Sequence, residues 1–124
     1  MPFDGTSKAS VAAQSMTILG MLEPIFAGGA RWARRTYCAP DGKRCLLAAV
    51  DHARYETGAT DDRAAEYLAV AINLRQLSRA LPPLGDTPTV TVMGFNDAFR
   101  RSYAEVAEIV TKAKELAAID AGRC

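Results

Sequence analysis

Apolar residues near the start of the chain recur at every third or fourth position, which is the period of an amphipathic α-helix. Either Ser7 or Ser10 can cap the start of this helix, because a serine hydroxyl accepts a hydrogen bond from a free backbone N–H. Pro24 predicts a kink or an early end, and Gly28-Gly29 follows as a stop signal. The residues expected to face the core are Val11, Ala12, Ser15, Ile18, Leu19, Leu22, Ile25 and Phe26.

Two more stretches with the same period follow in the middle of the chain. The first covers 44–55. The second begins at Thr60 or Asp61 and stops at Pro82-Pro83, because the residue before a proline avoids the helical conformation. The first helix is expected to bury Leu46, Ala49, Val50 and Ala53. The second is expected to bury a main stripe of Tyr67, Val70, Leu74, Leu77 and Leu81, widened by Leu68, Ala71 and Ile72.

Two other segments indicate a small β element. Threonine and valine alternate over Thr89–Met93, which is the period of a half-buried strand. Asp41-Gly42 lies between two segments that could be extended, and it predicts a two-residue hairpin turn. That register places Cys38 opposite Cys45 and supplies a partner for the strand.

The last part of the chain predicts one more helix after a turn at 95–99. Ser102 and Glu105 have the spacing of a capping box, and the helix is expected to fade near Asp120. Its apolar positions are Tyr103, Val106, Ile109, Val110, Ala113, Leu116 and Ala117. We therefore expect a mainly α fold: a single compact domain over 1–124, of about four helices with a small β-hairpin and short-strand element. Frayed tails are expected at 1–6 and 120–124.

Composition agrees with a globular domain. The chain has 124 residues, of which 49% are hydrophobic and 23% charged, and this is typical of proteins that bury their own core. The apolar stretch around Glu23 and Pro24 falls short of the ~20 residues that span a bilayer, and the N-terminus has no signal-peptide pattern. We expect a cytoplasmic protein without membrane contact, whose cysteines stay reduced.

The segment 31–45 concentrates cations and aromatic residues. Fifteen Lys and Arg against fourteen Asp and Glu give the whole chain a formal charge of +1, so it lacks the basic balance of a dedicated nucleic-acid binder. Arginine and tryptophan are common at the centres of protein interfaces, and arginines beside aromatic rings can also bind phosphates and unpaired bases. A solvated basic surface is the plainer interpretation. The candidate binding residues are Arg31, Trp32, Arg34, Arg35, Tyr37, Lys43 and Arg44.

Cys38, Cys45 and His52 repeat at intervals of seven residues. Zinc ligands are usually two to four residues apart, so this spacing does not predict a metal site. We favour Cys45 as a small buried residue at the start of the second helix. His52 with Asn96 and Asp97 could line a pocket, but no cofactor motif and no catalytic motif accompanies them.

The order of three landmarks resembles that of a known group of proteins. They are Trp32 beside a glycine-rich turn, DGKRCLLAA at 41–49, and FNDAF at 95–99 before the last helix. This order is similar to an uncharacterised family, a domain of unknown function, of small bacterial and phage proteins. Ala48 departs from the glycine of that pattern. The family has no assigned activity, cofactor or catalytic residue, so the resemblance implies only a bacterial or mobile-element origin.

These observations favour a small non-enzymatic protein that binds another protein through the Arg/Trp segment. The resemblance adds a phage- or prophage-derived inhibitor or accessory factor as one specialisation of that function. A nucleic-acid-binding accessory protein using 31–45 is the first alternative. An enzyme of unknown reaction centred on His52 is the second.

Overall fold

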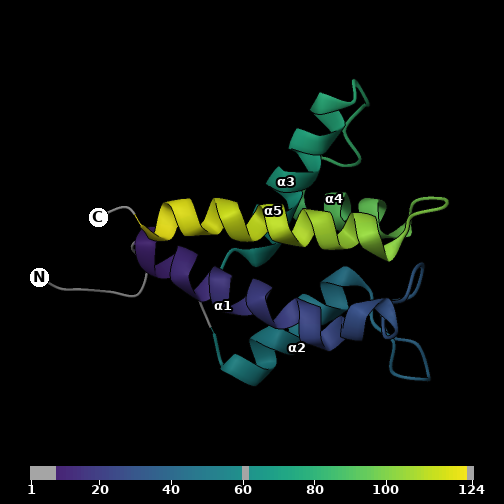
Figure 1. Cartoon of the computed structure of the whole chain (residues 1–124), viewed down its shortest axis with the longest axis horizontal. Coiled ribbons are helices and arrows are strands. Elements are labelled where there is room, and N and C mark those ends of the chain that lie inside the picture. Colours follow the sequence, from purple (N-terminus) through teal and green to yellow (C-terminus); the bar gives the residue numbers. More distant parts are fainter. Residues whose placement is uncertain (1–7, 60–61, 123–124) are drawn as a thin grey trace, which may run out of the picture.

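The computed structural model describes residues 8–59 and 62–122, which form five α-helices and one turn of 3-10 helix (Figure 1). The elements are α1 (Lys8–Phe26), η1 (Ala27–Gly29), α2 (Leu46–Thr57), α3 (Ala64–Ser78), α4 (Pro88–Asp97) and α5 (Tyr103–Ala121). Long helices α1 and α5 lie side by side, and α3 crosses α5 at a steep angle. The prediction of a mainly α single domain is confirmed. Five helices replace the expected four, and no strand occurs in the described part of the chain.

The core lies where all five α-helices meet. α1 buries the face predicted for it, except that Ile25 is only partly buried. Pro24 sits on the exposed side and the helix continues past it to Phe26, so it does not end early. Ser10 lies inside α1 and is not its cap, and Ser7 lies outside the described residues. The largest fully buried side chains are Phe26, Phe95, Ile18, Leu19, Leu22, Leu46, Leu68 and Ile72.

Residues 9–29 form one helical segment that is long and apolar enough to cross a membrane by length and composition alone, contrary to the sequence expectation. A core helix of a globular domain passes the same test. Here 39% of the apolar window is buried inside the domain, where α1 packs against α2 and α5.

The segment predicted to be a strand is helix α4. Thr87 caps this helix, because its hydroxyl accepts from the Val90 N–H at 3.2 Å, and Pro88 follows at the first helical position. Both are standard signals for a helix start. The buried residues Thr91, Val92, Phe95 and Asn96 have helical spacing. The prediction was wrong because β-branched residues favour strands only weakly, and tertiary packing overrides that preference.

The predicted β-hairpin is also wrong. Residues 30–45 form an irregular loop with two isolated bridges. Within it, the Gly42 N–H donates to the Ala39 carbonyl and the Ala39 N–H to the Lys43 carbonyl. The turn therefore contains three residues, Pro40 to Gly42, with Gly42 in the left-handed region (φ 88°).

The extra turn residue changes the environment of both cysteines. It shifts the register by one, so Cys38 lies opposite Arg44 instead of Cys45. A one-residue slip turns side chains to the opposite face. Cys45 is accordingly buried and Cys38 exposed, and both are free thiols. Cys45 lies at the start of α2, as favoured from the sequence, whereas Cys124 lies outside the described residues.

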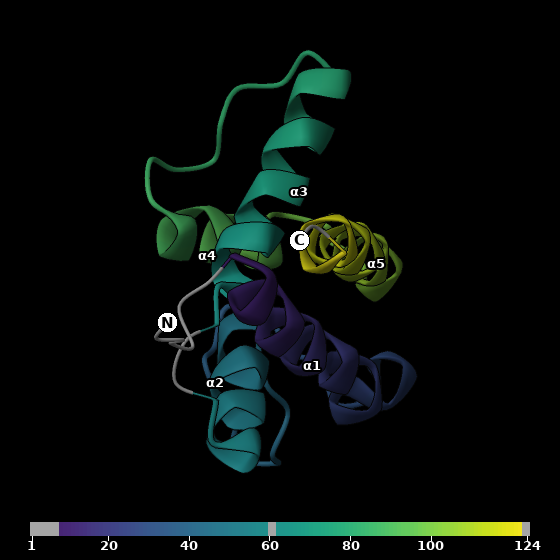
Figure 2. The same ribbon diagram turned by 90° about the vertical axis from the view of Figure 1, so that its left-hand side faces the viewer.

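Helix α3 buries only part of the face predicted for it, namely the residues expected to widen the main stripe, with Tyr67 partly buried. Leu68, Ala71 and Ile72 lie in the core. The first turns of α3 pack on α4 and α5, and Ile72 and Gln76 are also buried. Arg75 reaches Glu105 of α5 at 2.7 Å, and only the end of the helix projects from the bundle (Figure 2). The helix begins at Ala64, and the expected starts at Thr60 and Asp61 lie outside the described residues. Four members of the expected main stripe are 43–75% exposed: Val70, Leu74, Leu77 and Leu81.

The cap of α5 matches the prediction and also connects three helices. Glu105 accepts from the Ser102 N–H at 2.9 Å and donates its own N–H to the Ser102 hydroxyl at 3.3 Å, which completes the capping box. The other carboxylate oxygen of Glu105 binds Arg75 at 2.7 Å and Arg101 at 3.0 Å. Both guanidinium groups lie over the Phe95 ring. α5 then continues to Ala121, so Asp120 and Ala121 are helical although the sequence placed them in a tail.

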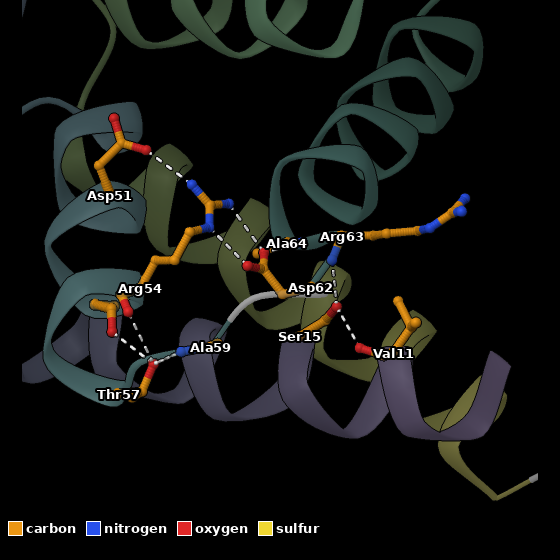
Figure 3. Close-up of polar contacts among 10 residues, drawn as sticks. Val11, Ser15, Asp51, Arg54, Thr57, Ala59, Asp62, Arg63 and Ala64 are labelled. Carbon is orange, nitrogen blue, oxygen red and sulfur yellow. Dashed lines mark hydrogen bonds and ion pairs between the residues drawn. The ribbon is translucent and has the colours of Figure 1, made fainter. Parts of the chain in front are cut away.

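A polar cluster fixes the start of α3 against α1 and α2 (Figure 3). Arg54 binds Asp62 through two hydrogen bonds of 2.6 and 3.0 Å, and Asp62 also accepts from the Ala64 N–H. The buried Ser15 hydroxyl of α1 accepts from the Arg63 N–H at 2.7 Å. The Asp62 side chain is only 1% exposed. Burial opposes its ionisation, but Arg54 and the Ala64 N–H outweigh burial and lower its pKa.

We expect Asp62→Asn to lower the free energy of unfolding by about 2 kcal/mol at pH 7, because it leaves Arg54 without its main partner. The pKa of Asp62 is depressed in the folded state, so its contribution is present above the unfolded value of about 3.9 and disappears as pH falls through the folded value. Urea unfolding at pH 7 and pH 3 measures the loss of stability that Asp62→Asn causes at each pH. The exposed Asp86→Asn is the matched control. An equal deficit at both pH values would contradict the assignment.

The end of α3 offers a second test. The Ala80 N–H donates to the Leu77 carbonyl and the Leu81 N–H to the Gln76 carbonyl, which is a Schellman motif with Ala80 in the left-handed region (φ 53°). Glycine adopts that conformation without steric cost.

Ala80→Gly should therefore raise the free energy of unfolding by about 1 kcal/mol. Ala13→Gly, at an exposed position inside α1, should lower it by about the same amount. Urea denaturation of the two variants measures both changes. A loss of stability in Ala80→Gly would show that α3 does not end in this motif.

Candidate functional site

Two loops meet at one end of the molecule, and Asn96 of α4 holds them there. The loops are 30–45 and 98–102, which lie at the same end in Figure 1. The buried Asn96 carbonyl oxygen accepts from the Trp32 indole N–H at 2.7 Å and from the Leu46 backbone N–H at 3.1 Å. Its amide nitrogen donates to the Ala33 carbonyl at 3.0 Å and to Asp97 at 2.9 Å. All the hydrogen-bonding groups of the side chain are thus used.

Trp32 anchors the longer loop to the helices. Its ring is half-buried against the core and lies 6.2 Å from the Tyr103 ring between centroids. Because the indole N–H is bonded to Asn96, the polar edge of the ring is also occupied. The structure therefore places Trp32 at the base of the loop, where it positions the neighbouring arginines.

Asp97 joins the two loops directly. Its carboxylate accepts from the Arg35 backbone N–H at 2.7 Å, with Arg35 in the left-handed region (φ 66°). The Arg34 guanidinium donates to the Ala98 carbonyl at 3.4 Å. These contacts bring Arg34 beside the shorter loop, which carries Arg100.

Most arginines on the two loops differ from the arginines that join neighbouring elements of the fold. Arg54, Arg63, Arg75 and Arg101 each form an ion pair with a carboxylate. Within the described residues, no carboxylate lies within ion-pair distance of the arginines on the two loops, apart from Arg101, whose side chain turns inward. Lys43 pairs with Asp41 at 3.7 Å. We call the unpaired set the basic end: Arg31, Arg34, Arg35, Arg44 and Arg100.

Two exposed aromatic rings accompany the basic end. Tyr37 is exposed and its hydroxyl donates to Asp51. Phe99 is 74% exposed, and the Arg100 guanidinium lies 5.3 Å from its ring centroid. The sequence analysis did not identify Phe99 or Arg100, because they lie more than fifty residues from the segment 31–45 and only the fold brings them to it. The sequence signal that could have identified them is an aromatic residue followed by two arginines, Phe99-Arg100-Arg101, between two helices.

A small cavity of about 120 Å³ lies behind the basic end. Asn96 and Asp97 line it, as the sequence suggested, but His52 does not. Its lining residues are Arg35, Thr36, Tyr37, Cys45, Leu47, Met93, Asn96 and Asp97.

The Cys45 thiol and the Tyr37 hydroxyl, which line this cavity, are not activated as nucleophiles. Burial raises the pKa of the Cys45 thiol, and its sulfur accepts from the Ala48 N–H at 3.5 Å as the cap of α2. The hydrogen bond to Asp51 raises the pKa of Tyr37 to about 12. Both groups therefore stay protonated at neutral pH, which is the opposite of what nucleophilic catalysis needs. Across residues 8–59 and 62–122, no three His, Cys, Asp or Glu side chains are grouped to hold a metal ion.

We expect Asn96→Ala to lower the free energy of unfolding by about 3 kcal/mol, because it leaves several buried polar groups without partners. The emission of Trp32, the only tryptophan, should shift to longer wavelength as its ring gains water. Urea titration and fluorescence measure the two effects. Asn73→Ala, at an exposed position of α3, should change stability by less than about 0.5 kcal/mol. An unshifted spectrum in Asn96→Ala would contradict the role of Asn96.

Comparison with known proteins identifies a family. A model described as "Family of unknown function (DUF6197)" matches residues 29–116, which include the longer loop, Asn96 and most of α5. No curated protein matches the chain, and no solved structure does. The matched segment covers well over half of the chain and confirms the resemblance seen in the sequence. The chain belongs to this family of unknown function, DUF6197.

Proposed function

We propose that this protein is a non-enzymatic binding protein whose basic end docks on an acidic surface of another protein. The observation that carries the proposal is the set of loop arginines without carboxylate partners. A guanidinium group that already forms an ion pair within its own domain has fewer free donors for a partner. The five arginines of the basic end form no ion pair within the described residues, although Arg34 donates one hydrogen bond to the Ala98 carbonyl. The exposed rings of Tyr37 and Phe99 add apolar area beside them.

The basic end is also held in place before binding. Asn96 and Asp97 fix the backbone on both sides of Arg34 and Arg35 through the contacts described above. Binding through a preformed surface loses less conformational entropy than binding through a disordered loop. This favours a specific partner contact.

A protein partner suits the surface better than a nucleic acid. Trp32 is half-buried against the core and beside the Tyr103 ring, which leaves less of its ring face for stacking on an unpaired base. The formal charge of +1 also gives weak long-range attraction to a polyanion. Arginine and tyrosine, in contrast, are frequent at the energetic centres of protein interfaces.

The test is capture of a partner from a bacterial lysate by the tagged protein, with and without nuclease. We expect a discrete protein that survives nuclease, and we expect Arg34→Glu and Arg100→Glu each to reduce its capture at least about tenfold. Arg63→Glu makes the same charge change at an exposed site on another part of the domain. It should leave capture within about twofold.

Two outcomes would contradict the proposal. One is capture that ignores both basic-end variants. The other is recovery of nucleic acid whose binding constant falls linearly with salt on logarithmic axes, which would make the same arginines a phosphate-binding surface.

A further inference from the structure

An open hollow of about 450 Å³ lies between α3 and α5, where the end of α3 rises away from α5 (Figure 2). Hollows of this volume are typical of sites that hold small organic molecules. None of the lining residues belongs to the two loops of the basic end, 30–45 and 98–102. The hollow is therefore a candidate site separate from the proposed partner contact.

The floor of the hollow is apolar. Ala71 of α3 and Ile109 of α5 are buried at its base, and Leu74 is 43% exposed beside them. Covering an exposed leucine with an apolar group removes unfavourable contact with water. The floor thus suits the apolar body of a ligand.

Positive charge predominates around this floor. The lining includes three cations, Arg75, Arg79 and Lys112, and one carboxylate, Glu108. Lys112 also pairs with Glu115 at 3.8 Å, but the two side chains are 49% and 62% exposed, and exposed pairs of this kind are weak. Arg79 is exposed, and none of the ion pairs formed by the described residues includes it.

Arg75 has to share its carboxylate partner. One oxygen of Glu105 accepts from Arg75 at 2.7 Å and from Arg101 at 3.0 Å, and the other accepts from the Ser102 N–H and hydroxyl. Burial lowers the pKa of Arg101, and the positive charges of Arg75 and Arg79 lower it further. The cations beside the hollow therefore exceed what the neighbouring carboxylate neutralises.

We propose that the hollow binds a small organic anion with an apolar body. The anionic group, a carboxylate, sulfonate or phosphate, lies between Arg75 and Arg79. The apolar body lies on Leu74 and Ile109. The two arginines are four residues apart on one face of α3, where like charges repel each other, and a bound anion relieves that repulsion.

The donors needed for such a contact are present. A guanidinium group has five N–H donors and can bind a planar or tetrahedral anion through two of them at once. Arg75 uses Nη2 for Glu105 and Nη1 for a long bond of 3.4 Å to Gln76. Its side chain is only 12% exposed, so a charge-assisted hydrogen bond to it is less weakened by water than one on an open surface.

The probe that tests this site is anilinonaphthalene sulfonate, an aromatic sulfonate whose fluorescence rises on apolar surfaces of proteins. We expect it to bind the folded protein with a dissociation constant of roughly tens of micromolar. Phenylnaphthylamine has the same rings without the sulfonate and should bind at least about fivefold more weakly. Sodium sulfate at an equal concentration should displace little of the probe, because sulfate has no apolar body. Amide shifts in NMR spectra should concentrate at 71–79 and 108–112.

Two lining residues should change the affinity for the sulfonate in opposite directions. Arg79→Gln should raise the dissociation constant at least about fivefold, because it removes an attractive charge. Glu108→Gln should lower the constant about twofold, because it removes the repulsive one. Arg63→Gln, an exposed arginine just before α3, is the matched control and should leave the constant within about twofold. Near-ultraviolet circular dichroism checks that each variant keeps its packing.

Variants of the basic end separate this site from the proposed function. Arg34→Glu and Arg100→Glu should bind the sulfonate as the wild type does. Loss of binding in these variants, with Arg79→Gln unaffected, would overturn the proposal by placing the sulfonate at the basic end. So would absence of binding, equal affinity for the neutral compound, full displacement by an equal concentration of sulfate, or a dissociation constant that neither Arg79→Gln nor Glu108→Gln changes.

Discussion

The buried Asn96 side chain is the contact on which the arrangement of the basic end depends. It lies on α4, it binds the first backbone N–H of α2, and it binds both the backbone and the tryptophan of the longer loop. An irregular loop cannot satisfy its own backbone groups, so its position has to be fixed by side chains from elsewhere. Here one amide side chain does this for the loop and a helix start together. Such a fully bonded polar group adds rigidity, because any displacement leaves buried partners unpaired.

Arginine plays two different parts in this domain. On the helices and at the α5 cap, arginines close ion pairs that hold neighbouring elements together, as Arg54 does with Asp62 and as Arg75 and Arg101 do with Glu105. On the two loops, the arginines of the basic end form no ion pair within the described residues; Arg35 is placed through its backbone N–H and Arg34 through one hydrogen bond to the Ala98 carbonyl. The net charge of the whole chain does not show this division, because it sums the ion-paired charges of the fold and the unpaired arginines of the basic end. The distribution of charge therefore identifies the candidate binding surface better than the total charge does.

The sequence predicted the helices and their caps correctly where local signals and burial agree. It predicted α1, α2 and α5 within about two residues where their ends are described, and the Ser102–Glu105 cap, since each has regular periodicity and a clear start or stop. It failed where tertiary packing decides. Thr89–Met93 has strand composition but is helical because Thr87 and Pro88 start a helix and Phe95 is needed in the core. α3 has apolar residues on two faces, and periodicity alone cannot tell which one the other helices cover.

The central claim is that Asn96 holds the longer loop and the start of α2 in one rigid unit. Hydrogen exchange measured by NMR tests it most directly at the Leu46 backbone N–H, which lies in the first turn of α2 and has no partner within that helix. The account predicts that this N–H and the Trp32 indole N–H both exchange roughly a hundredfold more slowly than exposed groups. Exchange of both at the rate of an unprotected chain, while the centre of α2 stays protected, would contradict it.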